Sequence, residues 1–402
     1  MTITKKILSI IVTLSLVLTM SMTAFAADMG GTVDRLGANR DGNSITVSGS
    51  TTDVTAAVFV QVLDGSNIIA SQTFPVNGEG AFKGTINVTS TTLSDDTDYL
   101  VRAADLDGGE WKTSTISSVA VVKGYSLALD SYVGVKYYIV LDESLANNDT
   151  VVHFEIKDSL VSNLKSQDVP FAESERVRVG DTVCYNFYCK VAPAEMNIPI
   201  SATLTNGDKT VPFDNFTVRD YANYIIEDEK SEFNTATEEL AKAIRSYGYY
   251  AQVKFNAAGE RYDGDAVPFD YSIVGLPVFT VPSVEGIAFY GTSVSFLSGA
   301  MIKVYYTITD NGAVITVNGS EQAPSGSSSV KSVRTDEISI SESGIPIAFS
   351  ITNSNGDTEE FEYNVLNYLA AVINSGADED MKNLAAAYYT YYMAVRSYVN
   401  AG

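Results

Sequence analysis

Short runs in which apolar and polar residues alternate follow one another at even spacing between residues 28 and 122. Alternation with a period of two is typical of half-buried β-strands. Clusters of turn-forming residues, such as those at 64–67 and 77–80, separate the runs. Six or seven short strands in this arrangement predict a β-sandwich of the immunoglobulin type, of which residues 117–122 form the last strand.

The pattern changes after residue 122, where strands are followed by helices twice over. In residues 123–256, β-branched and aromatic runs give way to Leu240, Ala243, Ile244 and Tyr247, which fall at helical spacing on one face. Residues 287–402 repeat this plan, with helices predicted at 366–373 and 381–399. We therefore predict a multi-domain, mainly β chain. It has an N-terminal Ig-like β-sandwich followed by two α+β repeats, each a small antiparallel sheet with a C-terminal helical hairpin over one face.

Matching residues support the two repeats. Asn223-Tyr224-Ile225 matches Asn367-Tyr368-Leu369, and the later positions Tyr247 and Asn256 match Tyr391 and Asn400 without a gap. The order of these matches is kept while the sequence between them has drifted, which indicates a duplicated module. The prolines, glycines and acids of 257–286 favour an extended linker between the two copies, and the Ser- and Gly-rich stretch 322–331 favours a mobile loop.

The first repeat also resembles a known kind of module. The resemblance rests on the following motifs: Tyr125-Ser126-Leu127, Val135-Lys136-Tyr137-Tyr138, Cys189-Lys190-Val191-Ala192 with Glu195-Met196, Val218-Arg219-Asp220-Tyr221-Ala222-Asn223-Tyr224, and Tyr247-Gly248-Tyr249-Tyr250-Ala251-Gln252. It resembles a module that recurs in large secreted proteins of anaerobic Gram-positive bacteria, beside Ig-like and surface-attachment domains. The resemblance implies a secreted or cell-surface, non-catalytic module and supplies no site residues.

The first 27 residues are predicted to be a signal peptide. Lys5 and Lys6 precede an apolar stretch, and Ala24-Phe25-Ala26 is a cleavage site of small residues. The sequence therefore predicts a secreted, extracellular protein. It shows neither a sorting signal with a hydrophobic tail nor a lipoprotein cysteine, so we expect any cell-surface association to be non-covalent.

The charge narrows the classes of partner. The chain carries a formal net charge of -23, which becomes -25 when the two lysines of the signal peptide are removed. A chain this acidic is repelled by nucleic acid and by anionic membrane surfaces, so neither is expected as a partner. Solubility outside the cell is the favoured explanation of this charge, and calcium binding by the acidic turn at 105–110 is the alternative.

Residues for catalysis are scarce. The single histidine, His153, alternates with apolar neighbours and is expected on the surface with Glu155. Cys184 and Cys189 are expected to be unpaired and mostly buried, because an odd separation along one strand places them on opposite faces. We predict no enzymatic activity, no metal site and no cofactor, although paired carboxylates for glycoside hydrolysis would leave no trace in sequence spacing.

Aromatic residues are the positive signal, with 24 tyrosines, 17 phenylalanines and one tryptophan. Trp111 lies at the base of a turn, and several tyrosines, Tyr389 and Tyr392 among them, crowd one helix. These three residues are the candidates for ligand binding, because ring faces bury the C–H surfaces of sugars at little entropic cost. The alternative is that Trp111 packs against the sandwich and that the tyrosines fill the core or the contact between modules.

Two hypotheses about function follow, and an enzyme acting on glycans is a third of low weight. The first is a secreted, non-enzymatic binding or adhesion protein, with a polysaccharide or cell-wall glycan as ligand. The second is a structural cell-surface protein that self-associates through its tyrosine-rich helical faces. Gel mobility in polysaccharides tests the first hypothesis, and light scattering tests the second.

Overall fold

A computed structural model describes residues 33–401 of the chain, except 53–55, 79, 95–96, 107–109, 118–119, 130–131, 143, 181, 228–232, 270–278, 280–281, 298 and 327–328. The predicted signal peptide, part of the acidic turn at 105–110 and much of the predicted linker lie outside the described residues. The protein is mainly β and has several domains, as the sequence predicts, and all its sheets are antiparallel.

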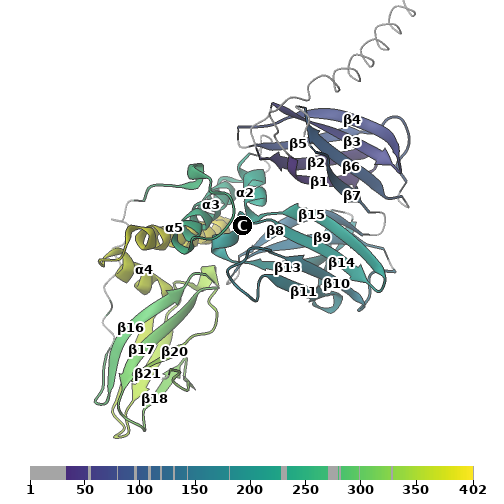
Figure 1. Cartoon of the computed structure of the whole chain (residues 1–402). Helices are drawn as coiled ribbons and strands as arrows, with labels where there is room; N and C mark the ends of the chain where they lie inside the picture. The colour runs from purple at the N-terminus through teal and green to yellow at the C-terminus, as the bar shows by residue number, and fades with distance from the viewer. Residues whose placement is uncertain are drawn as a thin grey trace, which may run out of the picture.

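The N-terminal domain is a sandwich of two sheets (Figure 1). One sheet has the order β1-β2-β5, formed by Val33–Asp41, Ser44–Thr51 and Ala81–Asn87. The other has the order β4-β3-β6-β7, formed by Asn67–Pro75, Ala57–Asp64, Tyr99–Asp105 and Lys112–Ile116. Alternate residues of β3 and β6, such as Val58, Val60 and Val101, are fully buried between the sheets. The apolar positions of the period-two pattern therefore form the core of the sandwich.

The strand predicted at 117–122 does not belong to this sandwich. It is the start of β8 (Ala120–Leu129), which pairs along its length with β9 (Val133–Leu141) in the following domain. Strand pairing between distant segments decides to which sheet a strand belongs, and alternation along the strand carries no information about it.

The first α+β repeat contains two sheets in place of the one small sheet that was predicted. Their strand orders are β12-β13-β9-β8 and β11-β10-β14-β15. The strands not yet given are β10 (Thr150–Glu155), β11 (Ser166–Pro170), β12 (Glu175–Val179), β13 (Thr182–Val191), β14 (Ile200–Asn206) and β15 (Lys209–Phe216). Tyr137, Phe154 and Phe187 are fully buried, so the strands bury their apolar faces in a core of their own. The helices α2 (Val218–Ile226) and α3 (Thr235–Phe255) follow.

The second repeat has the same element order. Its sheets are β16-β17-β20 and β19-β18-β21-β22, followed by α4 (Val365–Ile373) and α5 (Glu379–Ala401). Its strands are β16 (Ile287–Ser295), β17 (Met301–Ile308), β18 (Val314–Val317), β19 (Ser320–Glu321), β20 (Val330–Arg334), β21 (Ile347–Thr352) and β22 (Thr358–Tyr363). Among the described residues, β12 has no counterpart here. The predicted loop 322–331 is partly strand, because Ser325 pairs with Ser332 of β20.

Helix caps show how the two repeats correspond, and they correct the gapless alignment. Thr217 and Asp220 form a capping box at the start of α2, and Asn364 and Asn367 form one at the start of α4. Asn367-Tyr368 therefore corresponds to Asp220-Tyr221 and not to Asn223-Tyr224, which lies three residues further along the helix. The segment between the helices is three residues longer in the first repeat, at 227–234 against 374–378, and this restores the alignment of α3 with α5.

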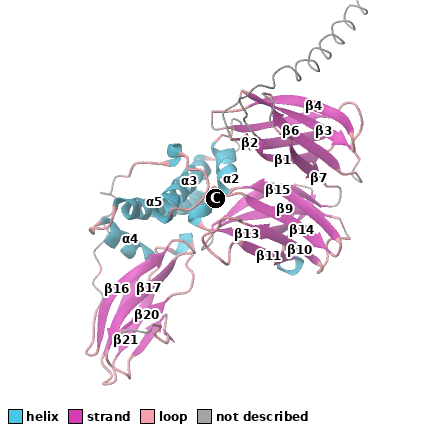
Figure 2. Cartoon of the chain, viewed as in Figure 1, coloured by secondary structure: helices cyan, strands magenta, loops and turns pink. Residues whose placement is uncertain are grey.

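The helices of the two repeats pack against each other between the β domains (Figures 1 and 2). The Tyr247 ring stacks on the Tyr391 ring at a centroid distance of 5.5 Å, and it meets Tyr388 edge-on at 5.4 Å. The ammonium of Lys254, near the end of α3, lies 2.8 Å from the carboxylate of Asp378, which precedes α5. The two long helices are thus antiparallel, and equivalent tyrosines meet near a local two-fold axis. Three tyrosines of these helices, Tyr247, Tyr388 and Tyr391, lie in this contact between repeats. Aromatic pairs of this kind bury a large area.

The N-terminal sandwich contacts the first repeat through α2. The guanidinium of Arg35 pairs with the Asp220 carboxylate at 2.6 Å, and the Lys83 ammonium lies 4.1 Å from the centre of the Tyr224 ring. No described helix is both long and apolar enough to cross a membrane.

Candidate functional site

The candidate ligand-binding face is the outer surface of the β4-β3-β6-β7 sheet, and Trp111 is its most prominent side chain. Trp111 directly precedes β7 and is 37% exposed. Its ring centroid lies 6.3 Å from that of Phe59 on β3, at an angle of 58°. Phe59 pairs with Ala104 of β6, whose side chain is small. The two aromatic rings therefore form one row across the sheet with a shallow floor between them.

A polar row lies next to this aromatic row. Gln61 of β3 pairs with Arg102 of β6, which pairs with Thr113 of β7. The Arg102 guanidinium lies 4.4 Å from the centre of the Trp111 ring, and its Nε donates to Oε1 of Gln61 at 2.7 Å. The cation–π contact and the hydrogen bond hold the guanidinium beside the indole. We name the surface formed by Phe59, Gln61, Arg102, Trp111 and the exposed threonines of β7 the Trp111 face.

The other two candidates, Tyr389 and Tyr392, lie on α5, far along the chain from this face. Tyr392 is only 5% exposed, and its hydroxyl lies close to Gly344. Because its ring is enclosed, Tyr392 presents no face to a ligand, and we correct its assignment as a binding residue. Tyr389 is half-buried beside it, with ring centroids 6.4 Å apart. The structure brings neither tyrosine to Trp111.

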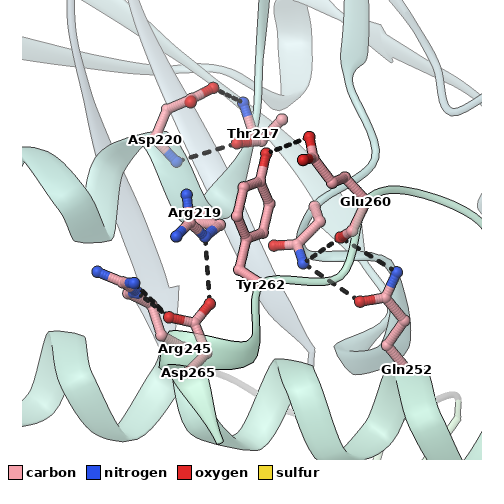
Figure 3. Close-up of polar contacts among 9 residues, drawn as sticks. Thr217, Arg219, Asp220, Arg245, Gln252, Glu260, Tyr262 and Asp265 are labelled. Atoms are coloured by element: carbon pink, nitrogen blue, oxygen red, sulfur yellow. Dashed lines mark hydrogen bonds and ion pairs between the residues drawn. The ribbon is translucent and has the colours of Figure 1, made fainter. Parts of the chain in front are cut away.

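A buried polar cluster, which sequence reasoning missed, lies where the predicted linker begins (Figure 3). Asp265, whose side chain is 2% exposed, accepts hydrogen bonds from Arg219 of α2 at 3.1 Å and from Arg245 of α3 at 2.6 Å. The ring of Tyr262 stacks on the Arg219 guanidinium at 3.5 Å. Burial and the hydrogen bond to Glu260 raise the pKa of Tyr262 to about 12.

The same cluster fastens the backbone that follows α3. Nε2 of Gln252 donates to the carbonyl oxygens of Ala258 and Gly259, at 3.0 and 2.9 Å. We name residues 257–269 the strap, because these contacts hold them against α2 and α3 rather than leaving an extended linker. The chemistry is structural: one carboxylate is shared by two arginines from different helices. The sequence offered only two arginines, Arg219 and Arg245, within the helical segments of the first repeat, and neither their burial nor their shared partner Asp265 could be identified from spacing.

The remaining titratable candidates lie apart from one another. His153 pairs with Asp168 at 2.6 Å on an exposed part of β10, so its predicted place on the surface is confirmed. Cys184 and Cys189 are free and buried, also as predicted. Burial raises the pKa of the Cys189 thiol, which leaves it protonated and unreactive at neutral pH. Among the described residues, no group of three or more metal-ligating side chains comes together.

Comparisons with known proteins add little to this picture. No family model and no curated protein matches the chain. Solved structures that it resembles include a titin fragment (A168169), with 13% identity and a TM-score of 0.16 over 47% of this chain and 98% of that one. Bovine butyrophilin has 9% identity and a TM-score of 0.16 over 46% and 95%. A tetra-tandem repeat from the extending region of a large adhesion protein has 11% identity and a TM-score of 0.17 over 84% and 75%. With scores this low, the conclusions below rest on the residues of this chain.

Proposed function

We propose that the chain is a secreted, non-enzymatic binding protein that holds a polysaccharide against the Trp111 face. The observation that carries the proposal is the row of Phe59 and Trp111 on an outward sheet face, next to the row of Gln61, Arg102 and Thr113. Pyranose rings have apolar C–H faces and polar rims. An aromatic row beside a row of hydrogen-bonding groups complements both features.

The flatness of the face favours a polymer over a small molecule. Side chains on a pleated sheet stand roughly perpendicular to it and line up in rows, so the surface extends along the strands without enclosing a ligand. A small ligand would bury too little of its own surface there. A chain of sugars, in contrast, gains area with every residue that lies on the sheet.

The direct test uses the fluorescence of Trp111, which is the only tryptophan of the chain. Titration with xylan, starch, mucin and pectin fragments should change its emission with at least one of them. Trp111→Ala should abolish the retardation of the protein in gels containing that polysaccharide. Tyr290→Ala, which removes a 68% exposed aromatic ring of the second repeat, is the matched control and should leave mobility unchanged. Unchanged mobility of the wild type in every gel would refute the proposal.

Self-association is a second candidate function, favoured by the exposed apolar side chains at the end of α5. Met393, Tyr398 and Val399 are 44%, 41% and 63% exposed. Light scattering should then show a mass that rises with concentration, and Val399→Lys should suppress the rise. A strict monomer at high concentration would rule this candidate out.

The non-enzymatic part of the proposal has its own test. Hydrolysis of any polysaccharide in the panel, lost on replacing a single acidic residue, would overturn it.

A further inference from the structure

The Trp111 face differs in charge from the protein as a whole. The chain has 49 acidic and 26 basic residues. Yet the outward positions of β3, β6 and β7 carry no carboxylate, and Arg102 is charged at their centre. The nearest acids along the described chain are Asp64 at the end of β3, Asp98 directly before β6, Asp105, which ends β6 and is buried, and Glu110, which precedes Trp111. These acids lie at the ends of the strands or outside them, so the cation at the centre of the strands is a local departure from the overall negative charge.

The guanidinium of Arg102 is oriented to receive an anion. Its Nε is engaged by Gln61, and no described residue accepts from its two terminal nitrogens. The contact with Trp111 holds the guanidinium next to the site where a sugar ring would lie. A planar fork of two N–H groups matches a carboxylate in a bidentate manner, which neutral hydroxyl groups cannot reproduce.

A second cation lies at the far end of β7. The exposed residue Thr115 lines a crevice of about 270 Å³ between the N-terminal sandwich and β15, together with Lys209, Thr210 and one acid, Asp98. From Trp111 to Thr115 the chain advances by roughly 13 Å, at about 3.3 Å per strand residue. The Trp111 face is therefore long enough for several sugars, with Arg102 near one end and Lys209 near the other.

From these observations we infer that the ligand is an acidic oligosaccharide whose uronate carboxylates bind Arg102 and Lys209 while one of its rings stacks on Trp111. This inference rests on the proposed function, because it names the class of glycan that the same face takes. Charge complementarity carries it: the outward positions of β3, β6 and β7 hold no carboxylate while Arg102 lies among them, and the exposed ammonium of Lys209, which donates to Oγ of Ser144 at 3.2 Å, lies by the crevice at the far end of β7.

The experiment compares two forms of one polymer. Oligogalacturonate and its methyl ester have the same backbone, but only the first carries free carboxylates. Titrations followed by Trp111 fluorescence should give at least about tenfold tighter binding of the free acid at low salt, with the difference shrinking as salt rises. Arg102→Gln should remove most of this preference, and Lys209→Gln should reduce it.

Matched controls separate the site from the overall charge. Arg178→Gln and Lys165→Gln make the same charge changes at exposed positions of the first repeat, so they should leave the preference intact. Lys165 lies just before β11 and Lys209 begins β15, at opposite edges of one sheet. Circular dichroism of each variant confirms that it is folded.

The outcomes distinguish two kinds of failure. Equal binding of the acid and the ester, unchanged by Arg102→Gln but lost with Trp111→Ala when gel retardation is the readout, would overturn the inference and leave the proposed function standing. Tighter binding of a sulfated glycan than of the uronate would overturn the assignment of a carboxylate. Absence of binding to every glycan, with no effect of Trp111→Ala, would remove the proposed function and the inference together.

Discussion

The two α+β repeats have the same topology but fasten their helices in different ways. In the first repeat, the second residue of α2 is Arg219, which is held by Asp265 of the strap. In the second repeat, the corresponding residue of α4 is Leu366, and it lies near Gly344 and Tyr392 in an apolar contact. A buried ion pair and an apolar contact thus occupy equivalent places. The periodic pattern of apolar core residues is enough to maintain the topology. The contact that holds the first helix of each repeat can be polar or apolar.

The two repeats also differ in which element, the long helix or the loop that it packs against, supplies the large side chain. Gly248 and Tyr392 occupy the same position counted from Asn234 and Asp378, the residues that precede α3 and α5. Gly248 faces the side chain of Met196, whereas Tyr392 faces Gly344. The large side chain comes from the loop in one repeat and from the helix in the other. Constant packing density requires such compensation wherever the backbone is preserved.

The largest effect is expected from separating the two repeats. Tyr247→Ala and Tyr391→Ala should each lower the free energy of unfolding by about 3–5 kcal/mol, because each leaves a cavity the size of an aromatic ring. Since the two rings stack, the double substitution should cost less than the sum, with a coupling of about 0.5–1.5 kcal/mol. Urea unfolding of the wild type, the two single variants and the double variant measures this coupling. Additive losses would show that the rings do not interact, and Tyr389→Ala on the same helix should cost less.

Breaking the strap should affect the first repeat almost as strongly. Asp265→Ala leaves the guanidinium groups of Arg219 and Arg245 without the carboxylate that they share, at an expected cost of about 3–5 kcal/mol. Asp263→Ala, an exposed position of the same short helix, is the matched control and should cost less than about 0.5 kcal/mol. Equal unfolding midpoints for the two variants would show that the strap does not stabilise the fold.

The exchange of side-chain size predicts different costs in stability for one added methyl group in the two repeats. In Gly344→Ala the new Cβ would overlap the Tyr392 hydroxyl, so the ring must shift, at about 1–3 kcal/mol. In Gly248→Ala the new Cβ would lie 2.8 Å from Sδ of Met196, which is flexible, and alanine gains about 1 kcal/mol of helix propensity. We expect little net change for Gly248→Ala in thermal unfolding. A larger loss for Gly248→Ala than for Gly344→Ala would contradict this account.

The smallest effect concerns a hydrogen bond between the repeats outside the helices. The Tyr132 hydroxyl donates to Oε1 of Glu337 at 3.0 Å, and burial together with this carboxylate raises the pKa of Tyr132 from 10.0 to about 12. A raised pKa means that the folded state favours the neutral phenol. The stabilisation is therefore complete below pH 10 and is lost as the pH rises from 10 to 12.

Unfolding across this pH range should show wild type more stable than Tyr132→Phe by about 1 kcal/mol below pH 10. This advantage should fall towards pH 12. A constant difference between the two proteins would show that the Tyr132 phenol does not titrate in this way, and Tyr290→Phe serves as the exposed control.

Sequence patterns predicted more of the fold than of the site. Alternation identified the strands of the N-terminal sandwich, and the i, i+3, i+4 spacing identified all four helices to within a few residues. The strand at 117–122 was placed in the wrong domain and each repeat was given one sheet too few, since pairing partners are distant in the chain. For the site, the sequence named Trp111 as a candidate, with packing against the sandwich as the alternative, but it did not identify the neighbours Phe59 and Arg102. The assignment of Tyr392 was wrong, because helical spacing cannot say that the loop at Gly344 packs against its ring.

The sequence by itself determined the β-rich, two-repeat plan and the apolar periodicity of the core, because both depend on patterns a few residues apart. Only the tertiary structure decided which tyrosines meet across the local two-fold axis, which carboxylate holds Arg219, and which sheet face remains open around Trp111. These features depend on contacts between segments far apart in the chain. Many pairings are compatible with one pattern of apolar residues, and the packing of the whole chain selects among them.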